Sequence, residues 1–577
     1  MRTKRASRLA ACTAIVLSAG MLLAGPASAD TTPAGPHAAV KAPRSAPAPT
    51  LNLPHHPAAP ARKAPRAALA NAPVKAKPFF DADADGYSDL VVREPDDALY
   101  VSLSGTGQQE LPSSTLGAYK DIILPGDLGG SPAPEILDLS PSGKLTLHSD
   151  NSVAGGINYG GWSGSGWNMF NKVIAAGDVS GDGRSDLLAR TPDGDLYLYT
   201  GTGDLNAPFA AGKKVGSGWD RYDQIVGAND ANGDGLGDVY GRTPSGDLYF
   251  YAGTGNAADP LAAGVKVGWG YNTFNQIVGI DDQTGDGIGD LLARDVSGQV
   301  WFYAGNGDGT LKARTEGGKG WQGAQFFGSG GNPVYGKDDL VGLDGNGTLS
   351  SYWGLGNGQL SSANKGPAGG WDGVHYLALP SSLQTASRWA SILEIGGNGE
   401  LYVNGNDLGG GWNIYNSVIG IGDLTGEGNG DLIARQPGNG HLYLYPGNGA
   451  GSAVYSRIDI GGGWNVYDKL MGAGDINGDG LPDLLARTPG GDLYLYAGTG
   501  SAKTPFKGRV RLAGGGWNMY SAKMIATPGD LTGDGRSDIV AADSAGNLWR
   551  YDANGSGGFN DRVKIGYGWN TFKYGIY

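Results

Sequence analysis

The chain has 577 residues, among them 105 glycines and one cysteine, and a formal net charge of −13 at pH 7. This acidic balance argues against a basic face that binds phosphates, so we expect no nucleic acid partner. A single cysteine excludes disulfides within the chain, and Cys12 lies in a segment that we expect to be removed.

The N-terminus has the pattern of a secretory signal peptide. Four basic residues up to Arg8 precede an apolar stretch, 9–24, and small residues follow at 27–29. The apolar stretch is too short for a permanent membrane span, and no later run reaches eighteen apolar residues. We therefore expect cleavage after Ala29, removal of residues 1–29, and a secreted protein without a transmembrane segment.

Residues 30–77 have the composition of a linker. Alanine and proline make up 25 of these 48 residues, and no hydrophobic period runs through them. Such a segment is expected to be semi-extended and unfolded. Because it and the signal peptide are basic, residues 78–577 carry a net charge of −23. We expect part of this negative charge to be neutralised by a bound group that is not part of the chain.

From residue 78 onward the chain is built of repeats. The stretch GDVSGDGRSDLLART at 177–191 has six counterparts, and three of the six steps between consecutive copies are 52 residues. Three degenerate copies, near Asp127, Gly331 and Leu383, bring the number of units to ten, seven of them with an intact acidic loop. The first aspartates of the intact loops are Asp81, Asp178, Asp230, Asp282, Asp423, Asp475 and Asp530.

Each unit has the pattern of four short strands. Residues 185–203 alternate polar and apolar side chains on either side of a Pro-Asp-Gly turn, which is typical of a hairpin. Two more short apolar runs precede each loop. Four strands in about 52 residues is the period of a propeller blade. The sequence thus predicts an all-β fold, a β-propeller of about ten four-stranded blades.

Ten blades can close as two rings of five or as one large ring. A Gly-x-Gly-Trp segment precedes most loops, but the first loop has none before it, and the last segment, at Trp569, has no loop after it. The C-terminal segment can therefore complete a sheet begun earlier. We favour two rings, 78–328 and 329–577, closed by the segments of Trp321 and Trp569, because four to eight blades is the usual range.

The acidic loop has the chemistry of a calcium site. Oxygen-bearing side chains at positions 1, 3, 5 and 9 can wrap a cation, the carbonyl at position 7 can join them, and a glycine at position 6 allows the turn. The missing glutamate at position 12 and the flanking strands exclude an EF-hand. Zinc is not expected, because no histidine or cysteine lies nearby.

We therefore expect up to seven Ca²⁺ ions. The predicted ligands at positions 1, 3, 5 and 9 of the seven loops are Asp81, Asp83, Asp85 and Asp89; Asp178, Ser180, Asp182 and Asp186; Asp230, Asn232, Asp234 and Asp238; Asp282, Thr284, Asp286 and Asp290; Asp423, Thr425, Glu427 and Asp431; Asp475, Asn477, Asp479 and Asp483; and Asp530, Thr532, Asp534 and Asp538.

This pattern, Asp-x-[Asp/Asn/Ser/Thr]-x-Asp-Gly-x-x-Asp-Leu between strands, resembles the FG-GAP or VCBS repeats, known best from the propeller of integrin α chains. The resemblance implies that the residues named above bind Ca²⁺ in hairpin loops at the rim of the ring. The three degenerate units depart from the pattern, and we expect no metal there. The cage residues of integrins are poorly kept, so ligand binding in the integrin manner is not implied.

The remaining motifs leave the ligand open. The Gly-x-Gly-Trp segments resemble those of tachylectin-like lectins, in which case the tryptophans stack on sugars; the alternative is that they pack between blades. The arginines after the second strand, such as Arg190, are expected to form structural ion pairs. After the linker there are three histidines, at non-equivalent positions, and no nucleophile or phosphate-binding motif: His148, His375 and His441.

We therefore expect a monomeric binding or adhesion module for an extracellular protein or glycan that is not an enzyme. A lectin-like propeller is the first alternative, and a hydrolase with a site in the propeller channel is the second.

Overall fold

The computed structural model describes residues 27–28, 49–54 and 78–577, except for 84–85, 94–97, 104–106, 117–118, 131–133, 141–142, 150, 152–154, 296, 322–323, 332–338, 355–357, 370, 372–373, 379–390, 427–428, 449–451, 533 and 556–557. The chain divides into two compact units. We call Ala48–Val334 the first ring, and Tyr335–Tyr577 with Met1–Pro47 the second ring. No helix in the described residues is long and apolar enough to cross a membrane.

In the described part of the first ring there are five antiparallel sheets. They are β6 (Asp121–Ile123), β7 (Ile136–Leu139), β8 (Leu145–His148) and β9 (Trp162–Gly164); β10 (Lys172–Gly177), β11 (Asp186–Arg190), β12 (Leu196–Tyr199) and β13 (Lys213–Gly216); β14 (Gln224–Asn229), β15 (Asp238–Arg242), β16 (Leu248–Tyr251) and β17 (Val265–Gly268); β18 (Phe274–Gly279), β19 (Leu291–Asp295), β20 (Val300–Tyr303) and β21 (Thr315–Lys319), extended by β2 (Thr50–Leu51); and β22 (Gln325–Phe327), β3 (Leu90–Arg93), β4 (Leu99–Leu103) and β5 (Gly107–Glu110).

The described part of the second ring also has five sheets. They are β26 (Val374–Ala378), β27 (Leu393–Gly396), β28 (Leu401–Val403) and β29 (Asn406–Asp407); β30 (Ser417–Gly422), β31 (Asp431–Arg435), β32 (Leu442–Tyr445) and β33 (Ile458–Gly461); β34 (Lys469–Gly474), β35 (Asp483–Arg487), β36 (Leu493–Tyr496) and β37 (Val510–Ala513); β38 (Ile525–Gly529), β39 (Asp538–Ala542), β40 (Leu548–Tyr551) and β41 (Val563–Tyr567), with β1 (Ala27–Ser28) in parallel; and β42 (Gly575–Ile576), β23 (Asp339–Leu343), β24 (Leu349–Trp353) and β25 (Asn364–Lys365).

Apolar clusters between neighbouring sheets run all the way around each ring. In the first ring, the clusters join the sheet of β3 to those of β6 and β10, then β10 to β14, β14 to β18, and β18 back to β3. In the second ring, they join β23 to β26, β26 to β30, β30 to β34, β34 to β38, and β38 back to β23. Each ring is therefore a closed five-bladed propeller.

The seam of each ring is a sheet made from both of its ends. Phe326 of β22 pairs with Val92 of β3, and Ile576 of β42 pairs with Gly342 of β23. The segments that follow Trp321 and Trp569 thus close the first and second ring. The predicted all-β propeller of ten blades is confirmed, and the topology matches two rings of five.

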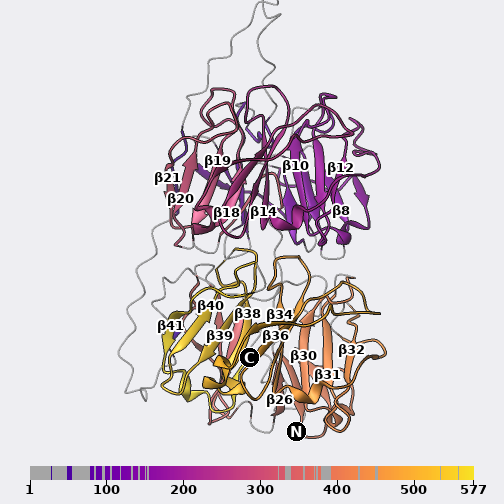
Figure 1. Ribbon diagram of the computed structural model, residues 1–577, viewed down its shortest axis with the longest axis vertical. Coiled ribbons are helices and arrows are strands. Elements are labelled where there is room, and N and C mark those ends of the chain that lie inside the picture. The colour runs from indigo at the N-terminus through magenta and orange to yellow at the C-terminus, as the bar shows by residue number, and fades with distance from the viewer. Residues whose placement is uncertain are drawn as a thin grey trace, which may run out of the picture. The chain divides into compact units, whose positions relative to one another are not determined.

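The first strands of neighbouring sheets approach closely at the centre of each ring. Figure 1 shows β10, β14 and β18 next to one another, and these strands are in contact. A Cβ atom on Gly227 of β14 would lie 1.8 Å from the carbonyl oxygen of Ala175, and one on Gly279 would lie 2.0 Å from that of Gly227. Only glycine permits this spacing at these two positions.

A glycine-rich segment fills the centre of the first ring. Residues 328–331 follow β22, and the carbonyl of Ser329 accepts the N–H of Ala175 at 2.7 Å, while its Oγ accepts the N–H of Gly227 at 3.0 Å. Gly330, with φ of 89°, leaves no room for a side chain, because a Cβ would lie 2.6 Å from Ile123. The segment therefore occupies space that a channel-bound substrate would need.

Single 3₁₀ turns carry the Gly-x-Gly-Trp motifs into the next blade. Their aromatic residues are at most 8% exposed, and the ring of Trp219 lies 4.6 Å from that of Tyr251. These rings pack within the fold and do not present a face to solvent. The turns are η1 (Trp167–Met169), η2 (Trp219–Arg221), η3 (Tyr271–Thr273), η4 (Trp412–Ile414), η5 (Trp464–Val466), η6 (Gly516–Met519) and η8 (Trp569–Thr571), and η7 (Ala522–Met524) follows η6.

An arginine at the end of the second strand holds the next Trp turn. Arg190 donates from Nη1 to the carbonyls of Trp219 and Tyr222 and from Nε to Asn171. The expected ion pair is present at Arg242, which meets Asp223 at 2.7 Å, and at Arg487. At Arg190 an asparagine takes the place of the acid. These arginines tie consecutive blades together, which is a structural role.

Candidate metal centre

The acidic loops lie at the same place in their blades. Each leads into the second strand of its sheet; residues 178–186, for example, connect β10 to β11. The glycine at position 6, Gly183, has φ of 83°, which permits the sharp turn that brings the loop oxygens together.

The aspartate at position 1 organises the loop backbone. Asp178 accepts the N–H groups of Gly181 at 2.6 Å and Asp182 at 3.1 Å on Oδ1, and that of Gly183 at 2.7 Å on Oδ2. The same three bonds recur at Asp230, Asp282 and Asp475, and two of them are present at Asp530. The loop is thus curled around this carboxylate in each of these blades.

The aspartate at position 9 is buried and connects the loop to the hairpin. Oδ2 of Asp186 accepts the N–H groups of Val179 and Ser180, and Oδ1 accepts that of Gly201 at 3.0 Å, beyond the end of β12. Burial raises the pKa of Asp186 to about 6, that of Asp290 to about 7 and that of Asp238 to about 8. Burial also raises the pKa of Asp483 and Asp538 well above the usual value. A nearby cation would favour the charged form of these carboxyls.

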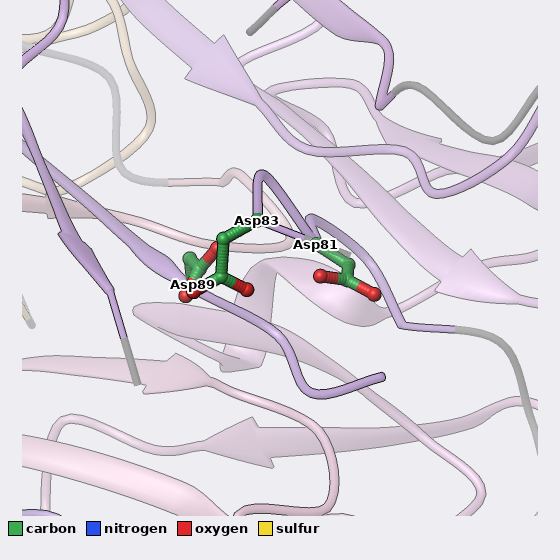
Figure 2. Close-up of side chains that lie close together, drawn as sticks. All are labelled: Asp81, Asp83 and Asp89. Atoms are coloured by element: carbon green, nitrogen blue, oxygen red, sulfur yellow. The ribbon is translucent and has the colours of Figure 1, made fainter. Parts of the chain in front are cut away.

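The first loop brings three carboxylates together. Ligand oxygens of Asp81, Asp83 and Asp89 all lie within 4.8 Å of one another, and Figure 2 shows the three side chains close together. Among the described residues, this loop alone forms such a group of three acidic side chains. Carboxylate oxygens at this separation are compatible with a hard cation such as Ca²⁺.

Two other loops contain a buried oxygen without a hydrogen-bond partner. Oγ1 of Thr425, at position 3, and Oδ1 of Asp538, at position 9, are shielded from solvent and make no hydrogen bond. An unsatisfied buried oxygen is costly, and a bound cation would satisfy Oγ1 of Thr425. Oδ1 of Asp538 corresponds to the oxygen that accepts the hairpin N–H in other blades, whereas its Oδ2 accepts the loop N–H groups of Leu531 and Thr532. The Thr425 oxygen and the oxygen donor sets of the loops fit a calcium ion.

The carboxylate at position 5 has a basic neighbour in four loops. Asp182 meets Arg184 at 3.1 Å, Asp286 meets Lys312 at 3.4 Å, and Asp534 meets Arg536 at 2.6 Å. Asp479 lies 3.6 Å from Lys507. A basic group here competes with a metal ion for the same oxygen, so these loops are weaker candidates than the first.

In five loops, the side chain at position 3 donates a hydrogen bond to another predicted calcium ligand of the same loop. Ser180, Thr284 and Thr532 donate to the position-1 aspartates of their loops, and the amides of Asn232 and Asn477 donate to the position-5 aspartates. In the fifth loop, Asp431 accepts the N–H groups of Leu424 and Thr425. Asp85 and Glu427 lie outside the described residues.

A hollow in the first ring lies beside two of the loops, and the sequence patterns did not predict it. It is lined by residues that include Tyr87, Asp230 and Asp282, and by the buried Asp281. Asp281 accepts the N–H of Phe79 at 2.6 Å, the amide of Asn229 at 2.8 Å and the hydroxyl of Ser88. Burial raises its pKa to about 6.

The sequence does contain a signal for this hollow. Asn229 and Asp281 stand just before their loops, where Gly177, Gly422, Gly474 and Gly529 stand in other blades. Both adopt positive φ, 56° and 53°, a conformation that costs a non-glycine residue energy. In these two blades, glycine is replaced by Asn229 and Asp281, whose side chains bond to each other, and this replacement marks the hollow in the sequence.

Comparison with known proteins supports the repeat assignment. The model of the FG-GAP-like repeat matches residues 423–486 and 475–541. Integrin alpha-4 of Xenopus laevis is 31% identical over 129 residues, which is 19% of this chain and 12% of the integrin's length.

Solved structures with detectable likeness include two lectins. One is an Agrocybe aegerita lectin whose structure concerns recognition of non-reducing terminal N-acetylglucosamine: 14% identity, 85% of this chain, 94% of that chain, TM-score 0.23. The other is the BP39L lectin of Burkholderia pseudomallei: 13% identity, 78% of this chain, 97% of that chain, TM-score 0.20. Residues 423–541 of this β-propeller thus match the FG-GAP-like repeat, and they lie in the second ring.

Proposed function

We propose that the protein is a secreted, calcium-stabilised propeller that binds an extracellular protein or glycan and has no catalytic activity of its own. The observation that carries the proposal is the repetition of one loop, with the same backbone bonds and the same oxygen donors, at equivalent places in the blades. A single such loop is commonly a plain turn, but repetition with all donors retained indicates selection for a ligand of those oxygens.

Residues at positions 1, 3, 5 and 9 would hold the ion, with the carbonyl at position 7. Bound calcium would supply positive charge that offsets the repulsion between the loop carboxylates at positions 1 and 5 and the carboxylate at position 9, where the second strand begins. Asp178 and Asp186 each accept three N–H groups, shared between their two oxygens, and a carboxylate has about four lone-pair sites, so each keeps a site for a metal ion. Loops of this kind in extracellular modules bind calcium with Kd values of about 10⁻⁴ to 10⁻³ M.

The surroundings of the histidines favour a binding protein over a hydrolase. His148 is buried between Asp138, at 2.7 Å, and the carbonyl of Asn158, at 2.6 Å, so both ring nitrogens are engaged. His441 meets Asp459 at 2.9 Å on the surface. The side chain of His375 lies outside the described residues. The two placed histidines do not share a site, and residues 328–331 fill the centre of the first ring.

Equilibrium dialysis against ⁴⁵Ca²⁺ tests the metal part of the proposal. We expect several calcium ions per chain, up to seven, and loss of one ion in Asp178→Asn. The exposed Asp259→Asn serves as a matched control outside the loops and retains the wild-type number. Absence of bound calcium at millimolar concentration, or equal stoichiometry in Asp178→Asn and wild type, argues against the loops as metal sites.

Glycan binding is a second candidate, and one exposed residue favours it. Trp269, in the middle of a Gly-x-Gly-aromatic segment, is 81% exposed, and Tyr567 at the equivalent position is 59% exposed. An exposed aromatic face can stack on a sugar. A glycan array probed with wild type and Trp269→Ala tests this: binding lost in a variant with an unchanged melting temperature supports it, and an array without hits contradicts it.

A further inference from the structure

A short segment from the predicted linker lies against the outer edge of one blade. In residues 49–54, which we call the strap, Thr50 pairs with Lys319 and Leu51 with Gly318, antiparallel to β21. The N–H of Asn52 donates to the carbonyl of Gly317 at 2.7 Å, and Nε1 of Trp321 donates to the carbonyl of Thr50 at 2.8 Å. The strap thus adds a fifth strand to the sheet of β18–β21.

The side chains of the strap alternate in the manner of a half-buried strand. Leu51 and Leu53 pack against the apolar cluster formed by this blade and the seam sheet, while Asn52 between them is exposed. Two leucines that point into a protein surface from an extended backbone are a specific recognition pattern: backbone bonds give affinity, and alternate side chains give selectivity.

The acceptor blade differs from its siblings where the leucines pack. The outer strand of each regular blade has a bulge, and the residue in the bulge is apolar and packs on the core in five of them: Val215, Val267, Ile460, Leu512 and Ile565. In β21 the bulge residue is Gly317, which has no side chain to pack there. The strap leucines supply the apolar contact that this blade lacks.

The next residue of β21 also fits an added strand. Gly318 has φ of 148°, and a Cβ atom on it would lie 1.9 Å from the carbonyl oxygen of Thr50. Glycine at this place therefore allows the strap to approach. Four sibling blades have glycine there as well (Gly216, Gly268, Gly461 and Gly566), so the missing bulge side chain at Gly317 is what distinguishes this edge.

We propose that the outer edge of β21 is an acceptor site for an extended segment with leucines two residues apart, filled in cis by residues 49–54 and able to take the same segment from a second copy of this chain. Residues 55–77 separate the strap from the first blade, and 23 residues can reach about 75 Å when extended. Strand exchange between copies is therefore within reach. In the wild type, the tethered segment has an effective concentration on the order of millimolar and occupies the site first.

Two complementary variants test this on the full chain. Leu51→Asp/Leu53→Asp disables the strap and leaves the acceptor edge intact. Gly318→Ala blocks the edge and leaves the segment free; the equivalent residue of β37 is Ala513, which does not share the positive φ of Gly318, so the folding of this variant is checked. Each variant alone is expected to be a monomer, and their 1:1 mixture at about 100 µM is expected to give a dimer of twice the mass by light scattering.

A labelled peptide of residues 48–55 gives the second measurement. We expect saturable binding to the strap-disabled variant, and at least tenfold weaker binding both to wild type and to a variant that combines the strap and edge changes. Near-ultraviolet circular dichroism checks that all variants are folded. If Gly318→Ala does not fold, Gly317→Val, with the residue of two sibling bulges, replaces it as the blocked edge.

Three results would overturn the proposal: a mixture that stays monomeric, no peptide binding by the strap-disabled variant, or equal peptide binding by the combined variant. None of these depends on calcium, so the acceptor site and the proposed metal loops can fail separately.

Discussion

Oδ1 of Asp186 accepts the backbone N–H of Gly201 at 3.0 Å, and this bond joins the end of an acidic loop to the end of the hairpin that follows it. The same bond links Asp238 to Gly253, Asp290 to Gly305, Asp431 to Gly447 and Asp483 to Gly498. The position-9 aspartate therefore serves the blade even before any metal is considered, because it satisfies backbone groups that are buried at the turn.

Removal of this carboxylate is expected to destabilise the first ring. Asp186→Ala leaves the N–H groups of Val179, Ser180 and Gly201 without their acceptor, at a cost of about 1–3 kcal/mol for an unsatisfied buried group. Urea unfolding in EDTA measures this without a metal contribution. The exposed Asp259→Asn is the control, and equal stability of the two variants would show that the loop bonds contribute nothing.

The arginine between blades is expected not to tolerate lysine. Arg190 is 1% exposed and donates to three acceptors, which a single ammonium group cannot reach together. Arg190→Lys should therefore lower the free energy of unfolding by about 2–4 kcal/mol. The exposed Lys213→Arg, measured in the same chemical denaturation series, should change it by less than about 0.5 kcal/mol. A loss at Lys213 as large as that at Arg190 would contradict a specific inter-blade role.

The close approach of the first strands predicts a sharp difference between two glycines. Gly227→Ala places a Cβ 1.8 Å from the oxygen of Ala175, so the strands must separate, and we expect a loss of about 3 kcal/mol or more. Gly161→Ala meets no atom within 4 Å and serves as the matched control. Melting temperatures measured by circular dichroism compare the two. Wild-type stability in Gly227→Ala would mean that the ring is wider than described.

Burial of Asp121 predicts a pH dependence of stability. Burial raises the pKa of this carboxyl to about 7, against the opposing effects of Lys172 and the N–H of Gly331. In the unfolded chain its pKa is about 3.9, so between about pH 4 and pH 7 the folded state holds a proton that the unfolded state has lost. The free energy of unfolding therefore falls as the pH rises through this window.

Asp121→Asn removes this dependence. Relative to wild type, the variant should gain stability from pH 4 to pH 7, by on the order of 1–4 kcal/mol. Urea titrations in EDTA at four pH values measure the difference. A constant difference between variant and wild type over this range would show that the carboxyl does not titrate as its burial implies.

The repeated parts of this fold could be predicted from the sequence, and the parts that occur once could not. The loop pattern around Asp178 appears seven times and the step of 52 residues three times, so chance matches are excluded by repetition. The segment at Trp569, with no loop after it, indicated how a ring closes, and the pairing of Ile576 with Gly342 confirms it.

Other features depend on neighbours far away in the sequence. Leu51 lies in a stretch whose composition predicts a linker, and its packing depends on the absence of a side chain at Gly317, which has meaning only beside the sibling blades. Ser329 lies at the ring centre because the first strands are close enough to bond it. Convergence of Asp81, Asp83 and Asp89 depends on loop geometry that spacing alone does not fix.

The most direct test of the account is the thermal unfolding of the full chain with and without calcium. For one site with a Kd of about 10⁻⁴ M, 2 mM Ca²⁺ adds about 1.8 kcal/mol to the free energy of unfolding, and several sites add more. We predict a melting temperature in 2 mM CaCl₂ that is higher by at least several degrees than in EDTA, with magnesium at the same concentration giving a smaller increase. An unchanged melting temperature in EDTA and in CaCl₂ would contradict the claim that calcium stabilises these loops.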